Sequence, residues 1–549
     1  MRILGSSREI FFPIFFLALK PLNSSKDYTS GLSSETLRNI QRKLTTFSAT
    51  FVLWQKRGKD SRAFHNGRLD LVEHNNNDSS GEFQVSTRQT WSSRLTYILT
   101  VAGATIGFGA TWRFPYLVGE NGGGAYVLTF IAVMMLVGIP IILVENVIGR
   151  RAQANSVDAF ALAVRDPARK ASPLWKIFGY MGLIGAFGIL AYYMVIGGWV
   201  FSYIWHILLG AAGFSSGLDL SSPITKEITE SFYVESIENS PFAIACCTLF
   251  FVFINWIILR KGIISGIERS VKYLMPLLFL CLLIMVIRNL TLDNAAEGVR
   301  FYLTPDFSKI TPKLLLDVLG QVFFALSLGF GVMITLSSHL NRQEDMVKTA
   351  VITGVVNTLV AVMAGFMIFP SLFSAHLAPD SGPSLVFKSL PIAFSEMPFG
   401  NFFAIVFFVL LVVAALTTSL TIYQVIICVL VERLRASLRE AINLTLGAIF
   451  VFGNIPCILT YGPWRDVRIL NRNIFDAFDF VSGNICFVLT ALGATLFVGW
   501  VMKHEALEEI DNGGELPHKM TGLWYGLVRY AIPLVIIAIF IYGLRGFFA

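Results

Sequence analysis

Two clusters of glycine are the residues of this sequence whose spacing first suggests chemistry. Gly103, Gly107 and Gly109 fall within seven residues of one apolar segment, and Gly329 and Gly331 lie close together five segments later. Glycine lets a helix unwind, which frees backbone N–H and carbonyl groups. Half-helix N-termini attract a carboxylate, and freed carbonyls bind cations. Close packing between helices is the alternative for either cluster alone, but their corresponding positions favour two broken helices.

Charged residues inside apolar segments are the second such signal. Arg113 follows the first glycine cluster, Glu145 lies in the next apolar segment, and Asp479 lies near the start of another. A charge in apolar surroundings needs a partner or several hydrogen bonds. Asp479 is the best candidate in the sequence to pair with Arg113, although spacing alone does not assign the pair.

The elements that must hold these residues are membrane-spanning helices. Of the 549 residues, 54% are hydrophobic and 14% are charged, whereas roughly 25% are charged in soluble domains. This composition excludes a soluble globular protein, a disordered chain and a nucleic-acid-binding module. Eleven apolar segments exceed the roughly 18 residues that one span requires, which predicts an all-α polytopic membrane protein with eleven transmembrane helices. They lie near 95–117, 123–148, 176–210, 241–259, 263–288, 314–338, 347–375, 400–431, 440–461, 475–502 and 522–546.

The charges outside these segments predict the orientation. Lysine and arginine gather in the loops at 149–176, 260–261 and 433–439, whereas the loop 211–240 has one cation. The positive-inside rule therefore predicts a cytoplasmic N-terminus in the cell membrane. Residues 1–88 are polar and predict a disordered cytoplasmic extension. The six cysteines lie in or beside apolar segments and indicate no disulfide framework.

A series of motifs follows along residues 88–549. They are Gly107-Phe-Gly109, Trp112-Arg-Phe-Pro-Tyr116, Glu120-Asn-Gly-Gly-Gly-Ala125, Gly138-Ile-Pro140 with Glu145, Lys261-Gly-Ile-Ile-Ser-Gly-Ile-Glu-Arg269 and Gly320-Gln-Val-Phe-Phe-Ala-Leu-Ser-Leu-Gly-Phe-Gly331. In this order they resemble the neurotransmitter:sodium symporter family (sodium- and chloride-dependent neurotransmitter transporters), and most closely its bacterial-type amino-acid branch with eleven spans.

The resemblance implies a transporter domain over residues 89–549 with a five-plus-five inverted-repeat fold. Helices 1 and 6 are then the discontinuous ones. Repeat one covers about 91–288, repeat two covers about 313–502, and an extra helix covers 522–546.

The resemblance also implies a sodium site between spans one and eight. Neutral oxygens from a broken helix and adjacent hydroxyls suit a hard monovalent cation. For the two threonine hydroxyls, a bond to the preceding helical turn is the alternative interpretation. The implied ligands are the carbonyls of Gly103, Ile106 and Ala414 and the hydroxyls of Thr417 and Thr418.

The family's second sodium site is degraded in this chain. Ala110 stands where the family has Asn, and Ala325 stands where it has a hydroxyl, which leaves Asn357 and Thr105. The sequence therefore predicts one sodium ion rather than two. Chloride binding is not supported: Gln321 fits the chloride site that the resemblance implies, but Phe130, Ala325 and Ala361 offer no oxygen there.

The substrate prediction depends on Gly107. Monoamine transporters of the family have an Asp at this position, so the resemblance implies a substrate that brings its own carboxylate, which is an amino acid. An uncharged lining disfavours a charged substrate side chain, and its bulk favours a neutral, aliphatic one. The implied substrate-binding residues are Thr105, Phe108, Gly109, Ile189, Tyr193, Phe324, Ala325, Ser327, Phe330, Thr418 and Ile422.

Two gates complete the implied mechanism. Outside, Arg113 and Asp479 close over the substrate site. Inside, Arg88 pairs with Glu432, and Trp91 packs nearby.

The predicted function is sodium-coupled secondary active symport, which imports a neutral, aliphatic amino acid by alternating access. The partners are sodium, the amino acid and the lipid bilayer, with no nucleic acid. An enzyme is not indicated, since the seven histidines show no metal-ligand spacing. Two alternatives remain open: a non-transporting amino-acid sensor on the same scaffold, and a proton-coupled relative with Glu145 or His339 as the carrier.

Overall fold

The computed structural model describes residues 90–165, 171–377 and 385–548, and these residues are almost entirely helical. The only pairing of extended backbone among them is an isolated bridge between Ile469 and Arg472. The described residues belong to a compact unit that begins at Arg88. The prediction for residues 1–88 lies outside the described residues.

Nine helices in the described part of the chain are long and apolar enough to cross a membrane. Each matches a predicted span to within a few residues, because the apolar runs exceed the length that a bilayer requires. They cover Gly124–Ala152, Pro173–Ala211, Pro241–Leu259 (α10), Ser265–Leu290, Met346–Ser374 (α15), Gly400–Leu434 (α17), Leu438–Leu459, Ile474–Met502 and Thr521–Leu544.

The first predicted span is broken, as the glycine cluster indicates. Helix α3 (Arg94–Thr105) begins at a capping box, in which the Ser93 hydroxyl accepts from the Thr96 N–H. It ends at Thr105, and a second helical segment, Gly109–Glu120, continues at an angle of 53°. This second segment consists of the π-turn η1 (Gly109–Arg113) and α4 (Phe114–Glu120).

The sixth predicted span is broken in the same manner. Helix α13 (Pro312–Ala325) and helix α14 (Val332–Ser337) flank an unwound segment, 326–331. In this segment Ser327, Gly329 and Gly331 have φ values of 52°, 79° and 75°. Glycine adopts such positive φ values without a steric penalty because it has no Cβ atom. Helices α13 and α14 are each too short to cross a membrane alone. The described residues therefore contain nine helices that could span a membrane, or ten if the bent first pair counts as one span. The count of eleven stays a prediction.

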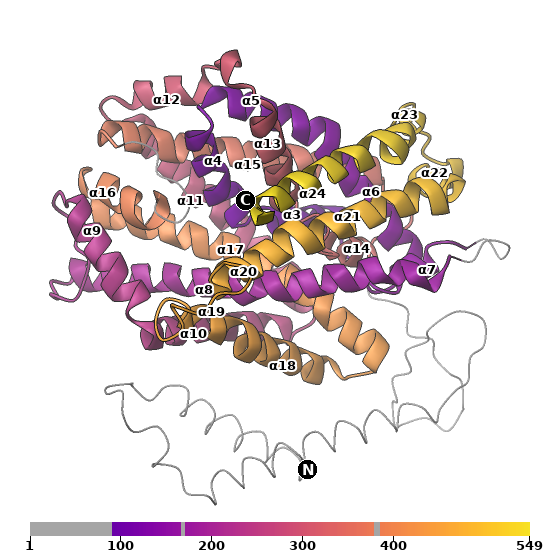
Figure 1. Ribbon diagram of the computed structural model, residues 1–549, viewed down its shortest axis with the longest axis horizontal. Helices are drawn as coiled ribbons and strands as arrows, with labels where there is room; N and C mark the ends of the chain where they lie inside the picture. The colour runs from indigo at the N-terminus through magenta and orange to yellow at the C-terminus, as the bar shows by residue number, and fades with distance from the viewer. Residues whose placement is uncertain (1–89, 166–170, 378–384, 549) are drawn as a thin grey trace, which may run out of the picture. The chain divides into compact units, whose positions relative to one another are not determined.

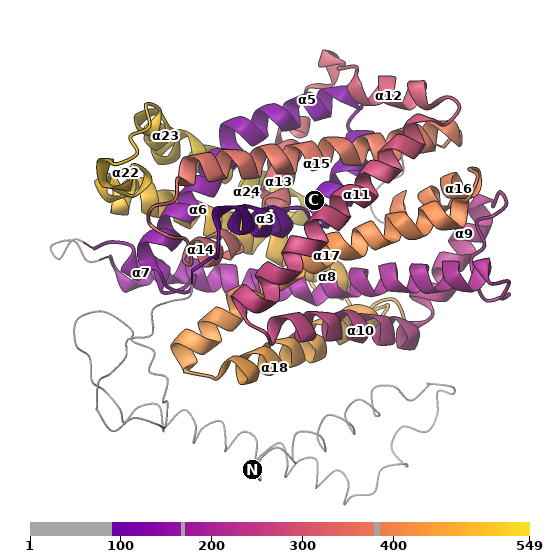
Figure 2. The same cartoon turned by 180° about the vertical axis from the view of Figure 1, so that it is seen from behind.

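The broken helices lie within the bundle rather than at its edge. Helix α3 contacts α11 (Arg269–Leu290), α14, α15 and α17, and the turned view in Figure 2 shows it surrounded by them. Helix α8 (Lys176–Ala211) runs alongside α17, as both views agree (Figure 1). Helices α8 and α17 therefore lie side by side, and both breaks pack near them.

Candidate functional site

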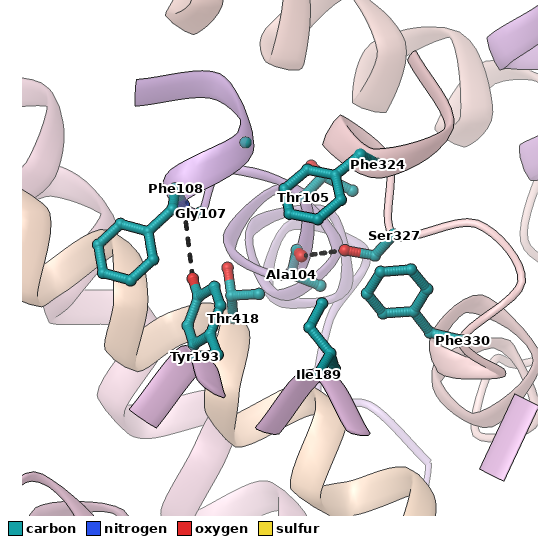
Figure 3. A pocket seen from close by; sticks show the side chains of 11 residues that line it. Ala104, Thr105, Gly107, Phe108, Ile189, Tyr193, Phe324, Ser327, Phe330 and Thr418 are labelled. Atoms are coloured by element: carbon teal, nitrogen blue, oxygen red, sulfur yellow. Dashed lines mark hydrogen bonds between the residues drawn. The ribbon is translucent and has the colours of Figure 1, made fainter. Parts of the chain in front are cut away.

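A cavity lies where the two breaks meet α8 and α17. Figure 3 shows its lining side chains, with Phe324 above, Tyr193 and Ile189 below, and Phe330 beside Ser327. No charged side chain lines it among the described residues. The lining residues are Ala104, Thr105, Gly107, Phe108, Gly109, Ile189, Tyr193, Phe324, Ser327, Phe330 and Thr418.

All but two of the predicted substrate-binding residues line this cavity. Ala325 lies behind it, where its carbonyl accepts from the Asn357 amide at 3.3 Å. Ile422 is fully buried on α17, one turn beyond Thr418, and is not among the lining residues. Ala104 lines the cavity but was not predicted. Side-chain chemistry gives no indication of Ala104, because the polar group that it brings to the cavity region is its backbone carbonyl.

Four carbonyls of the first broken helix accept hydrogen bonds from four separate parts of the fold. Thr418 on α17 donates to the Gly103 carbonyl at 3.1 Å, and Ser327 in the second break donates to that of Ala104 at 2.9 Å. Such bonds replace the intrahelical ones that the break removes. The remaining two donors are Asn357 on α15, to the Thr105 carbonyl at 3.1 Å, and Gln321 on α13, to the Gly109 carbonyl at 2.7 Å.

Gly107 occupies a position with no room for a side chain. A Cβ atom there would lie 2.6 Å from both the Thr418 hydroxyl and the Tyr193 hydroxyl. The neighbouring Phe108 N–H donates to the same Tyr193 hydroxyl at 3.4 Å. A carboxylate at position 107 would displace both hydroxyls, so the space is left for groups that enter the cavity from outside.

The residues predicted for the first sodium site lie together. The Thr418 hydroxyl contacts the Gly103 carbonyl, and the Thr417 hydroxyl donates to the carbonyl of Ala414 at 3.1 Å and to that of Val413 at 3.2 Å. Thr417 therefore makes the bond to its own preceding turn that the alternative interpretation expected. Ile106 is buried at the end of α3, with φ −92° and ψ 65°. The ligand roles of these groups stay predictions.

The second predicted cation site offers few oxygens. Asn357 directs its amide N–H₂ to the Thr105 and Ala325 carbonyls, and its Oδ1 has no hydrogen-bond partner among the described residues. The Thr105 hydroxyl donates back to the Ala102 carbonyl at 3.0 Å. Ala110 is fully buried and supplies no side-chain oxygen.

The predicted outer ion pair is not formed. No ion pair within 4.0 Å joins Arg113 to Asp479 in the described part of the chain; instead, the Arg113 guanidinium carbon lies 4.5 Å from the centroid of the Phe324 ring. Asp479 is exposed on α20 (Ile474–Phe480), and its charge acts on the half-buried guanidinium from beyond ion-pair distance. Attraction between the cation and the ring explains this arrangement. Arg113 thus covers the ring of Phe324, which lines the cavity.

The predicted inner gate is described only in part, because Arg88 lies outside the described residues. Glu432 on α17 accepts from the backbone N–H of Asn155 at 2.8 Å and from its amide at 3.1 Å. The indole of Trp91 donates to the Leu336 carbonyl at 3.0 Å and lies edge-on to the His339 ring. These contacts join the start of α3 to the end of α14.

Two connections were missed from the sequence. The buried Glu145 carboxylate on α6 (Ile139–Ala152) accepts from the Gly329 N–H at 2.7 Å, which ties the second span to the second break. Arg150, which is 1% exposed, donates to the Glu509 carboxylate at 2.7 Å and to the Glu344 carbonyl at 2.6 Å. In the sequence, Arg150 is one of the loop cations that predict orientation, and an arginine directly after an apolar run gives no signal of its distant partners.

Residues 88–216 and 227–548 match the model of the sodium:neurotransmitter symporter family. The chain belongs to this family. An uncharacterized sodium-dependent transporter of Haemophilus influenzae is 61% identical over 457 residues, covering 83% of this chain and 98% of that protein. The sodium-dependent transporter YhdH of Bacillus subtilis is 35% identical, covering 82% and 96%. The structure of MhsT in complex with L-phenylalanine matches with a TM-score of 0.74 and 35% identity, covering 83% of this chain and 100% of MhsT.

These relatives confirm the predicted family and the predicted all-helical symporter fold. This member of the sodium:neurotransmitter symporter family is a sodium-dependent, multi-pass membrane transporter, and its relatives are transporters rather than enzymes. The cavity at the two breaks is then the candidate site for the transported molecule, and the first predicted sodium site lies directly beside it, since both share Thr418.

Proposed function

We propose that this transporter imports a neutral, aliphatic amino acid together with sodium by alternating access. The observation that carries the proposal is the cavity between the two breaks, whose polar groups are backbone groups and hydroxyls and whose described walls carry no charge. An α-amino and α-carboxyl pair is satisfied by carbonyls and N–H groups at broken helices. A charged substrate side chain would be buried there without a partner, which is costly.

The carboxylate is the recognised group in this proposal. The N–H groups of Phe108 and Gly109 and the Tyr193 hydroxyl bind it, while the Thr105 carbonyl and Ser327 bind the amine. Gly107 supports this arrangement, because a side chain at that position would meet the hydroxyls of both Thr418 and Tyr193.

The preference for an aliphatic side chain rests on the apolar end of the cavity. Ile189 and Phe330 are each 1% exposed and form that end. A branched aliphatic side chain fills such a space without a polar atom. MhsT, which resembles this chain, binds L-phenylalanine, so an aromatic substrate is the comparison that the experiment must include.

One sodium ion accompanies the substrate in our proposal. It binds the carbonyls of Gly103, Ile106 and Ala414 with the hydroxyls of Thr417 and Thr418, and it holds the first break against α17. The paucity of side-chain oxygens at the second site supports a single ion without chloride. In our proposal the transporter lies in the cell membrane with its N-terminus in the cytoplasm. Arg113 and Asp479 form the outer gate. The inner gate consists of Arg88, Glu432 and Trp91.

The test is uptake into proteoliposomes that contain the full-length protein. Labelled alanine, valine, leucine, methionine and phenylalanine are supplied with an inward sodium gradient, and potassium replaces sodium in the control vesicles. We expect sodium-dependent accumulation of the aliphatic amino acids. Ligand-dependent thermal stabilisation without uptake would indicate a sensor, and uptake driven by a proton gradient without sodium would indicate a proton-coupled carrier. Either result would overturn the proposal.

A further inference from the structure

Phe487, which is not among the residues lining the cavity, is in direct contact with one that is. Its ring stacks on the ring of Phe330 with centroids 3.5 Å apart and an interplanar angle of 21°. Phe487 is 3% exposed and ends the seven-residue π-turn η9 (Val481–Phe487). Such π-turns occur at functional sites because they redirect a side chain within a helix.

The fold brings Phe487 to this position through glycines on α8. A Cβ atom at Gly185 would lie 2.5 Å from the Phe487 ring, and one at Gly182 would lie 3.1 Å from the Gly329 carbonyl. Gly182, Gly185 and the cavity residue Ile189 share one face of α8, since they are spaced by three and four residues. The same face of α8 therefore meets the second break, the Phe487 ring and the cavity in succession.

The second break holds Phe330 from both sides. The Gly329 N–H is bound by Glu145, and the Phe487 carbonyl lies where a Gly329 side chain would start. Behind the Phe330 ring, the Phe487 ring fills the space into which it would otherwise withdraw. Aromatic rings stacked at this distance are in full contact, and interiors leave few gaps for such movement.

We propose that Phe487 is a positioning residue that sets the depth of the substrate cavity by holding the Phe330 ring forward. This inference rests on the proposed amino-acid transport and adds a determinant of substrate size. Without the Phe487 ring, Phe330 withdraws toward α8 and the apolar end of the cavity deepens. Large side chains then gain contact, whereas small ones lose it.

The experiment compares inhibition of labelled uptake by alanine, valine, leucine, phenylalanine and tryptophan in proteoliposomes of the wild type and Phe487→Leu. We expect the inhibition constant of valine divided by that of tryptophan to rise by about tenfold, the scale on which one methylene is discriminated in an apolar pocket. Phe497→Leu is the matched control. Phe497 is a fully buried ring of the same span that packs on Phe160 and Trp175 instead of the cavity, and its replacement leaves the ratio unchanged.

A double variant separates positioning from general packing. In a Phe330→Leu background the further change Phe487→Leu should alter the ratio less than twofold, because no ring remains to be held. A uniform change across all five amino acids, or an equal effect of Phe487→Leu with and without Phe330, overturns the inference. If Phe487→Leu does not fold, Phe487→Met is read by the same criteria. Should the wild type take up none of the five, the proposed function fails, not this inference alone.

Discussion

At the scale of single residues, carbonyl oxygens at the break in the first helix bond side chains from other parts of the fold. Thr418 illustrates the arrangement, since its hydroxyl reaches the Gly103 carbonyl while the same side chain lines the cavity. A change in that hydroxyl is therefore felt at both the proposed sodium site and the proposed substrate site. Two predictions address the two sites separately.

Replacing Gly107 with alanine should weaken substrate binding. The added methyl would approach the hydroxyls of Thr418 and Tyr193 to within 2.6 Å, and overpacking of this kind costs about 1–3 kcal/mol, or roughly five- to 150-fold in affinity. Uptake at low substrate concentration measures the effect. Gly320→Ala is the control, because nothing lies within 4 Å of a Cβ at that helical position. Equal uptake by both variants would contradict the prediction.

Replacing Thr417 with valine should raise the sodium concentration needed for half-maximal uptake. The hydroxyl is one of the proposed neutral ligands, and losing a hydrogen-bonding partner of a charge costs about 1.5–3 kcal/mol, or roughly ten- to hundredfold. Ser419→Ala serves as the comparison on the same helix, since the Ser419 hydroxyl donates to Asn255 at 2.8 Å instead. An unchanged sodium dependence in Thr417→Val would show that this hydroxyl only bonds its own helical turn.

At the scale of elements, the ends of the spanning helices are joined by ion pairs, of which the Arg150 pair is buried. The Arg150 guanidinium, at the end of α6, reaches Glu509 on α22 (His504–Ile510) and backbone carbonyls of residues 342–344. Asp158, in the loop after α6, contacts Lys176 at 2.7 Å and Arg433 at 3.4 Å. Each cluster joins at least three segments that are distant in sequence, so each fixes the relative position of spans.

Removal of the Arg150 side chain should strongly destabilise the protein. Breaking a buried pair from one side costs about 3–5 kcal/mol. Without Arg150, Glu509 keeps only its longer contact with Arg151, at 3.4 Å, and the carbonyl of Glu344 loses this donor. The thermal-unfolding midpoint of purified Arg150→Ala in detergent checks this expectation. Arg439→Ala, at an exposed position on α18 (Leu438–Ile449), should leave the midpoint nearly unchanged. Similar midpoints for the two variants would mean that α22 is held by other contacts.

The Asp158 cluster predicts acid sensitivity. Burial alone would raise the pKa of Asp158, but hydrogen bonds from Lys176 and Asn155 and the charge of Arg433 hold it below its usual value. A carboxyl whose pKa is lowered by folding stabilises the fold above its unfolded pKa of about 3.9, and this contribution is lost as the pH falls through the folded pKa. The wild type should therefore unfold at a higher temperature than Asp158→Asn near pH 7, and the difference should narrow below about pH 4. A constant difference across this range would refute the assignment.

At the scale of the whole molecule, the number of sodium ions limits how far the substrate can be concentrated. One charge moving through 100 mV supplies about 2.3 kcal/mol, and a tenfold sodium gradient adds about 1.4 kcal/mol. One ion thus sustains a substrate ratio of roughly 500-fold for a zwitterion, and two ions would square it. We expect a sodium-to-substrate flux ratio of 1:1 in dual-label proteoliposome uptake. A ratio of 2:1 would mean that Asn357 and the backbone carbonyls suffice for a second ion.

The sequence alone determined the class of this protein, the places of its spans and the two breaks. Apolar runs such as 400–431 are long enough to cross a bilayer, and a bilayer leaves the backbone no alternative to helices. Glycines such as Gly107 and Gly329 mark the breaks because the freedom of the backbone to unwind depends on the local residue type. The family motifs added the substrate residues, most of which the structure gathers around one cavity.

Only the tertiary structure decided which groups meet. Arg113 lies over Phe324 rather than beside Asp479, Glu145 binds Gly329, and Phe487 stands behind Phe330. Hydrogen bonds and ring contacts form between groups hundreds of residues apart, and hydrophobic periodicity carries no information about such distances. These contacts depend on how closely glycine-lined helices approach, which is a property of the packed bundle and not of any one segment.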